Sequence, residues 1–323
     1  MGICAPSPAA RLLARPAVHR LLIQRAHGAQ QVGEQAVLDA FRNLVAGGVD
    51  LIIGPTSSAV VDNILPTVEK AGVVLLTPTA SAVKFHGKDD MLFRINLTTR
   101  DNGRLYAEHY FAKGFKRISA AANENNRSFA ESWLTEFRTA FEALGGEIVS
   151  APYFDSTSAN YTPIIEAMLA PKPDALLFIA NAVDTARLSQ QARKVAPEIP
   201  LIAAEWAGTA QLIELGGRAV EGLMIVQNYN QDDTSERFQA FRSAYAKRFG
   251  KEPVFGSVLA HDAATAALDA LSRRPDGMSV KEALIKLGPY EGLQQQIRFD
   301  ENGDTTRVAY FMAIRDGRFV RAQ

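Results

Sequence analysis

Short apolar runs alternate along this chain with longer segments in which apolar residues recur at helical spacing. The runs lie at residues 21–23, 51–53, 73–76, 118–121, 175–179, 201–203 and 223–226. Between them, residues 35–46, 58–71 and 130–144 carry apolar side chains three and four positions apart, as amphipathic helices do. Strand, helix and strand repeated in this order are typical of parallel sheets covered by helices. The pattern therefore predicts an α/β fold.

The length of the chain predicts two domains. Its 323 residues exceed the usual size of one domain, so we expect two lobes, each with its own core. Helix ends are marked by Gly72 and by Gly145. No short-period repeat, low-complexity tract or heptad run appears in the sequence.

Composition excludes several classes of protein. Lys plus Arg and Asp plus Glu both total 35, so no basic surface for nucleic acid is expected. No run approaches the eighteen or so apolar residues of a membrane-spanning helix. The single cysteine, Cys4, excludes an internal disulfide. The first thirty residues carry scattered arginines without the continuous apolar core of a secretory signal, so we expect no signal peptide in the sequence as given.

Two hydroxyl-rich loops follow two neighbouring predicted strands. Residues 51–58 read Leu-Ile-Ile-Gly-Pro-Thr-Ser-Ser, and residues 73–81 read Val-Val-Leu-Leu-Thr-Pro-Thr-Ala-Ser. Parallel strands bring both loops to the same carboxyl edge of the sheet, where open α/β folds bind ligands. Backbone N–H groups and the Ser58 hydroxyl at a helix start can hold a carboxylate. The alternative interpretation is that Ser58 is only the N-cap of a helix.

These loops carry a resemblance to a known family. Gly54-Pro-Thr-Ser-Ser58 and Thr77-Pro-Thr-Ala-Ser81 resemble the first-lobe ligand signature of leucine/isoleucine/valine-type periplasmic solute-binding proteins of ABC transporters. The similarity covers roughly residues 21–323. It continues through Phe93-Arg94 and residues 126–133, 144–149, 221–223 and 299–303.

The resemblance implies a type I periplasmic binding protein-like fold, with two lobes whose parallel sheets are flanked by helices. We expect the first lobe at residues 21–97 and 232–288 and the second at 98–231 and 289–323, after a disordered start at 1–20. The three crossings between lobes are expected at 95–99, 227–233 and 287–296. The ligand would lie between the lobes and favour a closed form by hinge motion.

The resemblance also implies a ligand site in each lobe. In the first lobe, Ser58 would hold the ligand carboxylate, Thr79 and Ala80 would offer backbone groups, and Ser81 would offer its hydroxyl. In the second lobe, Phe129 stands where the family usually has a tyrosine that covers the ligand.

Two further second-lobe residues complete the expected site. Asn181 stands where relatives often place another aromatic residue. Glu205 matches the acidic residue that takes the ligand ammonium. A carboxylate at the end of an apolar strand is costly to desolvate unless a cation meets it, which suits this role. The alternative is a solvated loop glutamate.

The expected function is that of an extracytoplasmic solute-binding component for an amino acid or a related small carboxylate. It would act as a periplasmic monomer, with ABC permease subunits as partners and no cofactor, metal or catalytic residue. The five histidines lack metal-ligand spacing, and no phosphate loop or dinucleotide fingerprint is present. The alternatives are a sensory receptor domain of the same fold and a small α/β enzyme using Glu205 or His261. His261-Asp262 is expected to start a first-lobe helix.

Relatives of this type begin with a strand, a ligand-contacting loop and a long helix that this sequence lacks before residue 21. An unpaired strand edge would destabilise the first lobe. We therefore expect weaker ligand binding by the chain as given than by a chain with such upstream sequence.

Overall fold

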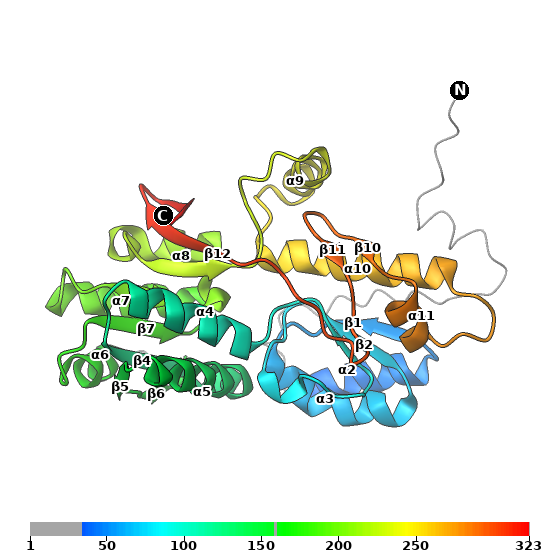
Figure 1. The fold of residues 1–323 in the computed structure, drawn as a ribbon, viewed down its shortest axis with the longest axis horizontal. Coiled ribbons are helices and arrows are strands. Elements are labelled where there is room, and N and C mark those ends of the chain that lie inside the picture. The colour runs from blue at the N-terminus through cyan, green and yellow to red at the C-terminus, as the bar shows by residue number, and fades with distance from the viewer. Residues whose placement is uncertain (1–33, 158–159, 323) are drawn as a thin grey trace. The chain divides into compact units, whose positions relative to one another are not determined.

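The computed structural model describes residues 34–157 and 160–322, and the chain divides into two compact units. Unit 1 comprises the described residues up to Ser81, together with Phe85–Asn96 and Asp233–Arg307. Unit 2 comprises Ala82–Lys84, Leu97–Asp232 and the described residues from Val308 onward. Figure 1 shows the helices and strands of both units coloured along the chain.

Residues 289–307 belong to unit 1, which corrects the prediction that they lie in the second lobe. The hairpin of β10 (Tyr290–Glu291) and β11 (Gln296–Ile297) packs against unit 1 helix α10 (Phe255–Arg273). The chain passes to unit 2 after Arg307, not within residues 287–296. The strand predicted at 21–23 and the disorder predicted for 1–20 lie outside the described residues.

Unit 1 contains a parallel sheet with strand order β1-β2-β3. Its strands are β1 (Leu51–Ile53), β2 (Val74–Thr77) and β3 (Leu92–Arg94). Its helices are α2 (Glu34–Ala46), α3 (Ser58–Ala71), α9 (Glu236–Phe249), α10 and α11 (Val280–Lys286). Val74 and Leu76 of β2 join a core with α10 and α11, because alternate residues of a strand face the same side. Figure 1 shows α10 on one side of β1 and β2 and α3 on the other.

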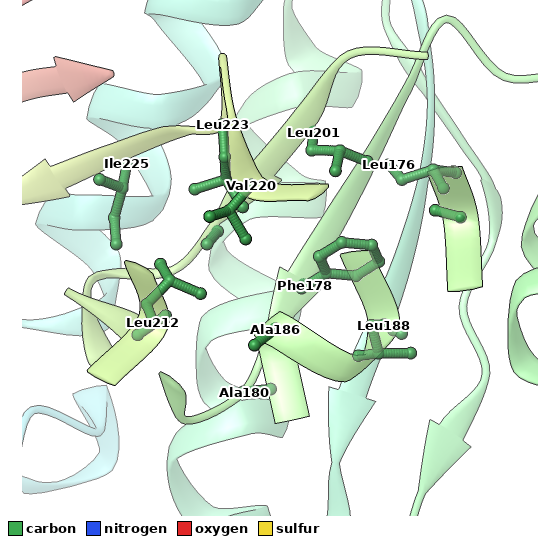
Figure 2. Packing of buried hydrophobic residues seen from close by; sticks show 14 of the residues in the cluster. Leu176, Phe178, Ala180, Ala186, Leu188, Leu201, Leu212, Val220, Leu223 and Ile225 are labelled. Carbon is green, nitrogen blue, oxygen red and sulfur yellow. The ribbon is translucent and has the colours of Figure 1, made fainter. Parts of the chain in front are cut away.

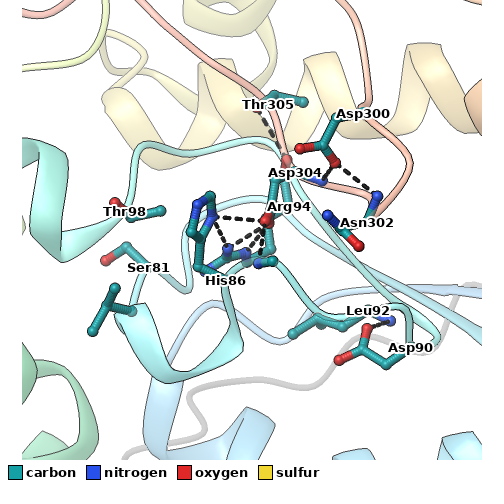
Figure 3. Close-up of polar contacts among 12 residues, drawn as sticks. Ser81, His86, Asp90, Leu92, Arg94, Thr98, Asp300, Asn302, Asp304 and Thr305 are labelled. Carbon is teal, nitrogen blue, oxygen red and sulfur yellow. Dashed lines mark hydrogen bonds and ion pairs between the residues drawn. The ribbon is translucent and has the colours of Figure 1, made fainter.

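A buried ion pair ties β3 to the loop that follows β11. The Arg94 guanidinium, 1% exposed, donates through Nε to Asp304 Oδ1 at 2.8 Å and also pairs with this carboxylate through Nη2. Asp304 Oδ2 accepts from the Gly87 N–H at 2.8 Å and lies 2.7 Å from His86 Nδ1 (Figure 3). Since an isolated buried charge is costly, each side chain needs the other to remain inside.

The loop after β11 also packs against β3, which brings together the Phe93-Arg94 motif and the motif at residues 299–303. The Phe93 ring packs edge-on against Phe299, with centroids 5.2 Å apart. Gly303 adopts φ +79°, and a Cβ there would lie 2.8 Å from the Leu92 carbonyl oxygen. Only glycine accepts both the left-handed backbone and this close approach.

Unit 2 contains a larger sheet with strand order β13-β12-β9-β8-β7-β4-β5, and β6 also pairs with β4. The central strands are parallel, but β12 runs antiparallel to both β9 and β13, which the sequence pattern did not predict. Its strands are β4 (Arg117–Asn123), β5 (Glu147–Ser150), β6 (Tyr153–Phe154), β7 (Ala175–Ile179), β8 (Leu201–Ala203), β9 (Met224–Gln227), β12 (Tyr310–Arg315) and β13 (Arg318–Arg321). Its helices are α4 (Thr99–Ala112), α5 (Arg127–Ala143), α6 (Thr162–Leu169), α7 (Ala182–Val195) and α8 (Ala210–Gly216).

Strand β7 is buried on both faces. Leu176 and Phe178 pack on one side with residues of α6, α7 and α8, as Figure 2 shows in part. Ala175, Leu177 and Ile179 pack on the other side with α4 and α5. A strand covered by helices on both sides reads as a continuous apolar run rather than an alternating one. This is why residues 175–179 were recognisable as a strand.

Candidate ligand-binding site

The two hydroxyl-rich loops of unit 1 meet at one edge of its sheet. Strands β1 and β2 are parallel neighbours, so both loops leave from their carboxyl ends. Thr77 Oγ1 donates to the Pro55 carbonyl at 2.6 Å, and Thr79 Oγ1 donates to the Thr56 carbonyl at 2.7 Å. These side-chain bonds hold the second loop against the first.

Ser58 and Ser81 are in direct contact within this edge. The Ser81 N–H donates to Ser58 Oγ at 3.2 Å, and both residues are 1% exposed. The N-cap of α3 is Ser57, so the alternative interpretation of Ser58 as the cap is wrong. The Ser81 hydroxyl is buried and has no hydrogen-bond partner among the residues that the structure describes. A buried hydroxyl without a partner is uncommon in folded proteins.

Thr79 and Ala80 lie between Thr77 and Ser81 in the second hydroxyl-rich loop. The Ala80 N–H donates to Thr77 Oγ1 at 3.2 Å, so this backbone group already has a partner. The Thr79 carbonyl accepts from Asn96 Nδ2 at 3.3 Å. Of the four unit 1 residues predicted to contact the ligand, Ser81 therefore offers the clearest unpaired group.

Glu205 follows strand β8 of unit 2 and is 5% exposed. Its Oε1 accepts from Asn102 Nδ2 at 2.8 Å, and its Oε2 accepts from Trp133 Nε1 at 2.9 Å. Burial raises the pKa of Glu205, opposed by its own backbone N–H and then by the bonds from Trp133 and Asn102. Both side-chain donors are neutral, so no ion pair offsets the desolvation of this carboxylate within the described residues. The alternative of a solvated loop glutamate is wrong.

Phe129 and Asn181 occupy different settings in unit 2. The Phe129 ring lies in the first turn of α5 and packs edge-on against Trp206, with centroids 5.6 Å apart. Asn181 is the N-cap of α7: its Oδ1 accepts from the Asp184 N–H at 3.0 Å, and its Nδ2 donates to Asp184 Oδ2 at 2.7 Å. The amide of Asn181 is thus already engaged within the protein.

Sequence reasoning missed the groups that surround these residues. Asn102 and Trp133 bind Glu205 from α4 and α5, across large sequence separations, and no local pattern marks them. Asp184 could have been found, because it stands three residues after Asn181 at a helix start.

His261 and Asp262 do not form an acid/base pair. They lie within α10 rather than at its start, and the His261 ring packs against Phe241. Asp262 is fully buried, where it accepts from Arg307 Nη2 at 2.8 Å and from the Leu293 N–H. Adjacent residues on a helix point in different directions, which explains the separate partners.

Two further observations concern other kinds of site. Within residues 34–157 and 160–322, no three His, Cys, Asp or Glu side chains are grouped to hold a metal ion. In the same part of the chain, no helix is both long and apolar enough to cross a membrane. A cavity of about 450 Å³ in unit 1 is lined by residues within 233–237 and 291–296 and includes none of the predicted ligand residues.

A family model described as "Periplasmic binding protein" matches residues 30–318, which is most of the chain. The chain belongs to the periplasmic binding protein family. A curated member from Pseudomonas aeruginosa, the "Leucine-, isoleucine-, valine-, threonine-, and alanine-binding protein", is 22% identical over 277 residues, spanning 84% of this chain and 72% of that protein.

Solved structures of periplasmic binding proteins share the fold. The leucine binding protein LivK from Thermotoga maritima has a TM-score of 0.82 at 25% identity, over 90% of this chain and 84% of that one. LivJ from Streptococcus pneumoniae, in complex with isoleucine, has a TM-score of 0.79 at 21% identity, over 89% and 82%. A solute binding protein from R. palustris, in complex with benzoate, has a TM-score of 0.77 at 17% identity, over 90% and 81%. The predicted fold class is confirmed.

Proposed function

We propose that this protein is the solute-binding component of an ABC transporter and binds an amino acid or a related small carboxylate without catalysis. The observation that carries the proposal is the buried Glu205 carboxylate, whose side-chain partners are both neutral. An ammonium group would supply the missing charge and a charge-assisted hydrogen bond. Membership of the periplasmic binding protein family supports a binding role.

The unit 1 edge offers groups that suit a ligand carboxylate. The Ser81 hydroxyl is buried beside Ser58 and is free to donate to a carboxylate. Thr79 and Ala80 lie in the same loop, and Phe129 with Trp206 offers an apolar surface in unit 2. By analogy with relatives, whose names include leucine and isoleucine binding, we assign Ser58, Thr79, Ala80, Ser81, Phe129 and Glu205 to ligand contact.

Asn181 has a different role in this proposal. Its amide is bonded to Asp184 through both the oxygen and the nitrogen, so it shapes the loop after β7 rather than binding the ligand through its side chain. In a transporter of this family the protein would act as a periplasmic monomer that delivers its ligand to ABC permease subunits.

A thermal-shift screen tests the proposal. The panel contains the twenty L-amino acids and benzoate, because benzoate has a carboxylate but no ammonium. A ligand at 100 times its Kd adds about 2.7 kcal/mol to the free energy of unfolding, which is easily measured. We expect an apolar L-amino acid to raise Tm and benzoate to have a smaller effect. If neither an amino acid nor benzoate shifts Tm, the proposed ligand class is wrong, and a shift with benzoate alone would remove Glu205 from ligand binding.

A further inference from the structure

A second buried carboxylate, Asp184, lies at the carboxyl edge of the unit 2 sheet. It is 2% exposed and occupies the first turn of α7. Its two oxygens accept four side-chain hydrogen bonds of 2.5–3.0 Å, and all four donors are neutral. The donors are Asn123, Ser156, Tyr161 and Asn181.

The four donors come from three separate loops. Asn123 ends strand β4, and Asn181 follows strand β7, its parallel neighbour in the sheet. Ser156 and Tyr161 belong to the connection between β6 and α6. The Asp184 carboxylate therefore links the three loops that follow β4, β6 and β7 at one edge of the sheet.

The chemistry of the network requires a carboxylate at position 184. A carboxylate only accepts hydrogen bonds, so it suits a site surrounded by donors. Its Oδ2 accepts from Asn123, Ser156 and Asn181, and its Oδ1 accepts from Tyr161. An amide at this position would replace one of the two accepting oxygens by an NH₂ group and would lack the charge that strengthens such bonds. Burial, and then its bond to Asp184, raises the pKa of Tyr161, so the phenol stays protonated and remains a donor.

The network also shapes the turn before Phe129, which is assigned to ligand contact. Asn123 Oδ1 accepts from the N–H groups of Asn125 and Asn126, which shapes the turn that leads into α5. Phe129 stands in the first turn of this helix. Asn181 begins α7 through its reciprocal bonds with Asp184.

We propose that Asp184 is a positioning residue of the unit 2 ligand site, which sets the loops after β4, β6 and β7 without contacting the ligand. The inference rests on the proposed function, because it concerns the same site. Ligand sites of open α/β sheets are built from loops at this edge. Small displacements of such loops cost affinity, because a site that is loosely held must be ordered on binding.

The test compares Asp184→Asn with Asp174→Ala. Asp174 lies just before the amino end of β7, where its Oδ2 accepts from the N–H groups of Lys116 and Arg117. Both substitutions remove polar contacts with β4, but Asp174 contacts the amino end of this strand at Arg117, whereas Asp184 contacts its carboxyl end at Asn123. We expect both to lower Tm, whereas only Asp184→Asn weakens L-leucine binding, measured by calorimetry, by about tenfold or more, equivalent to about 1.4 kcal/mol.

A hydrogen-exchange measurement completes the test. Backbone hydrogen exchange without ligand should become faster at residues 123–126 and 180–184 in Asp184→Asn but not in Asp174→Ala.

The outcomes separate this inference from the proposed function. Leucine affinity within about twofold of wild type in Asp184→Asn, or an equal loss in Asp174→Ala, would overturn the positioning role. If the wild-type protein binds neither an amino acid nor benzoate, the proposed function fails, and the hydrogen-exchange measurement alone tests the inference. Unchanged exchange at residues 123–126 and 180–184 would then refute the inference, and faster exchange would support it.

Discussion

Glu205→Gln should weaken amino-acid binding while making the free protein more stable. The substitution keeps the size of the side chain and removes its charge. Trp133 Nε1 can still donate to the remaining oxygen, since that bond needs only an acceptor. Asn102 can turn its amide, because its Oδ1 is buried without a partner among the described residues. The new amide is therefore accommodated without adding an unpaired buried group, because the turned Asn102 NH₂ group takes the place of the oxygen that already lacks a partner.

The loss of affinity follows from the charge. A ligand ammonium that loses its buried carboxylate costs about 2–5 kcal/mol, or about 30-fold to 5,000-fold in Kd. Ser58→Ala removes a neutral hydroxyl and should cost only about 0.5–1.5 kcal/mol. The order of the two variants is thus a direct consequence of the partners seen at Glu205.

The gain in stability follows from the pKa. Burial raises the pKa of Glu205 in the folded protein above 4.5, so the folded protein holds this proton more tightly than the unfolded chain. The free energy of unfolding then falls as pH rises from about 4.5 through the folded pKa. Glu205→Gln removes this loss, so it should be more stable than wild type at pH 8 and lose that advantage below pH 4.5.

Two measurements check the prediction. Calorimetric titration with L-leucine at pH 7.5 gives the affinities of wild type, Glu205→Gln and Ser58→Ala. Urea unfolding without ligand at pH 8 and pH 4 gives the stabilities of wild type and Glu205→Gln. Equal leucine affinity for wild type and Glu205→Gln would refute the ammonium contact. A variant less stable than wild type at pH 8 would refute the view that this carboxylate is unfavourably buried.

Three further substitutions test separate parts of the structure. Asp304→Asn should lower the free energy of unfolding, measured with urea, by about 3–5 kcal/mol, because the Arg94 guanidinium stays buried without its carboxylate. A loss below about 1 kcal/mol would contradict the pairing. Gly303→Ala should lower Tm more than Gly317→Ala does, because both glycines have positive φ but only a Cβ at 303 would lie 2.8 Å from a backbone atom, the Leu92 carbonyl oxygen. Equal losses of Tm would show that the backbone conformation alone matters. Ser81→Ala should leave the stability of the free protein unchanged and weaken leucine binding by about 0.5–1.5 kcal/mol; a clear loss of stability would mean that its hydroxyl is bonded inside the protein.

The sequence by itself determined several strands and helices and one edge of the site. Residues 51–53, 175–179 and 201–203 were predicted as strands with the bounds that the structure has, and residues 73–76 and 223–226 were displaced by one position. These predictions succeed because apolar periodicity is local and a buried parallel strand reads as an apolar run. The meeting of the Ser58 and Ser81 loops followed from strand order alone, because parallel neighbours end at one edge.

Only the tertiary structure decided which distant groups meet. Asp304 pairs with Arg94 across 210 residues, and this pairing helps hold residues 289–307 in unit 1 rather than in the second lobe. Asn102 and Trp133 reach Glu205 from two helices, and Asp184 gathers donors from three loops. A buried charge selects its partners by position in space and by the cost of leaving it unpaired. Neither the position of a partner in space nor the cost of an unpaired charge can be deduced from the local pattern of apolar and polar residues.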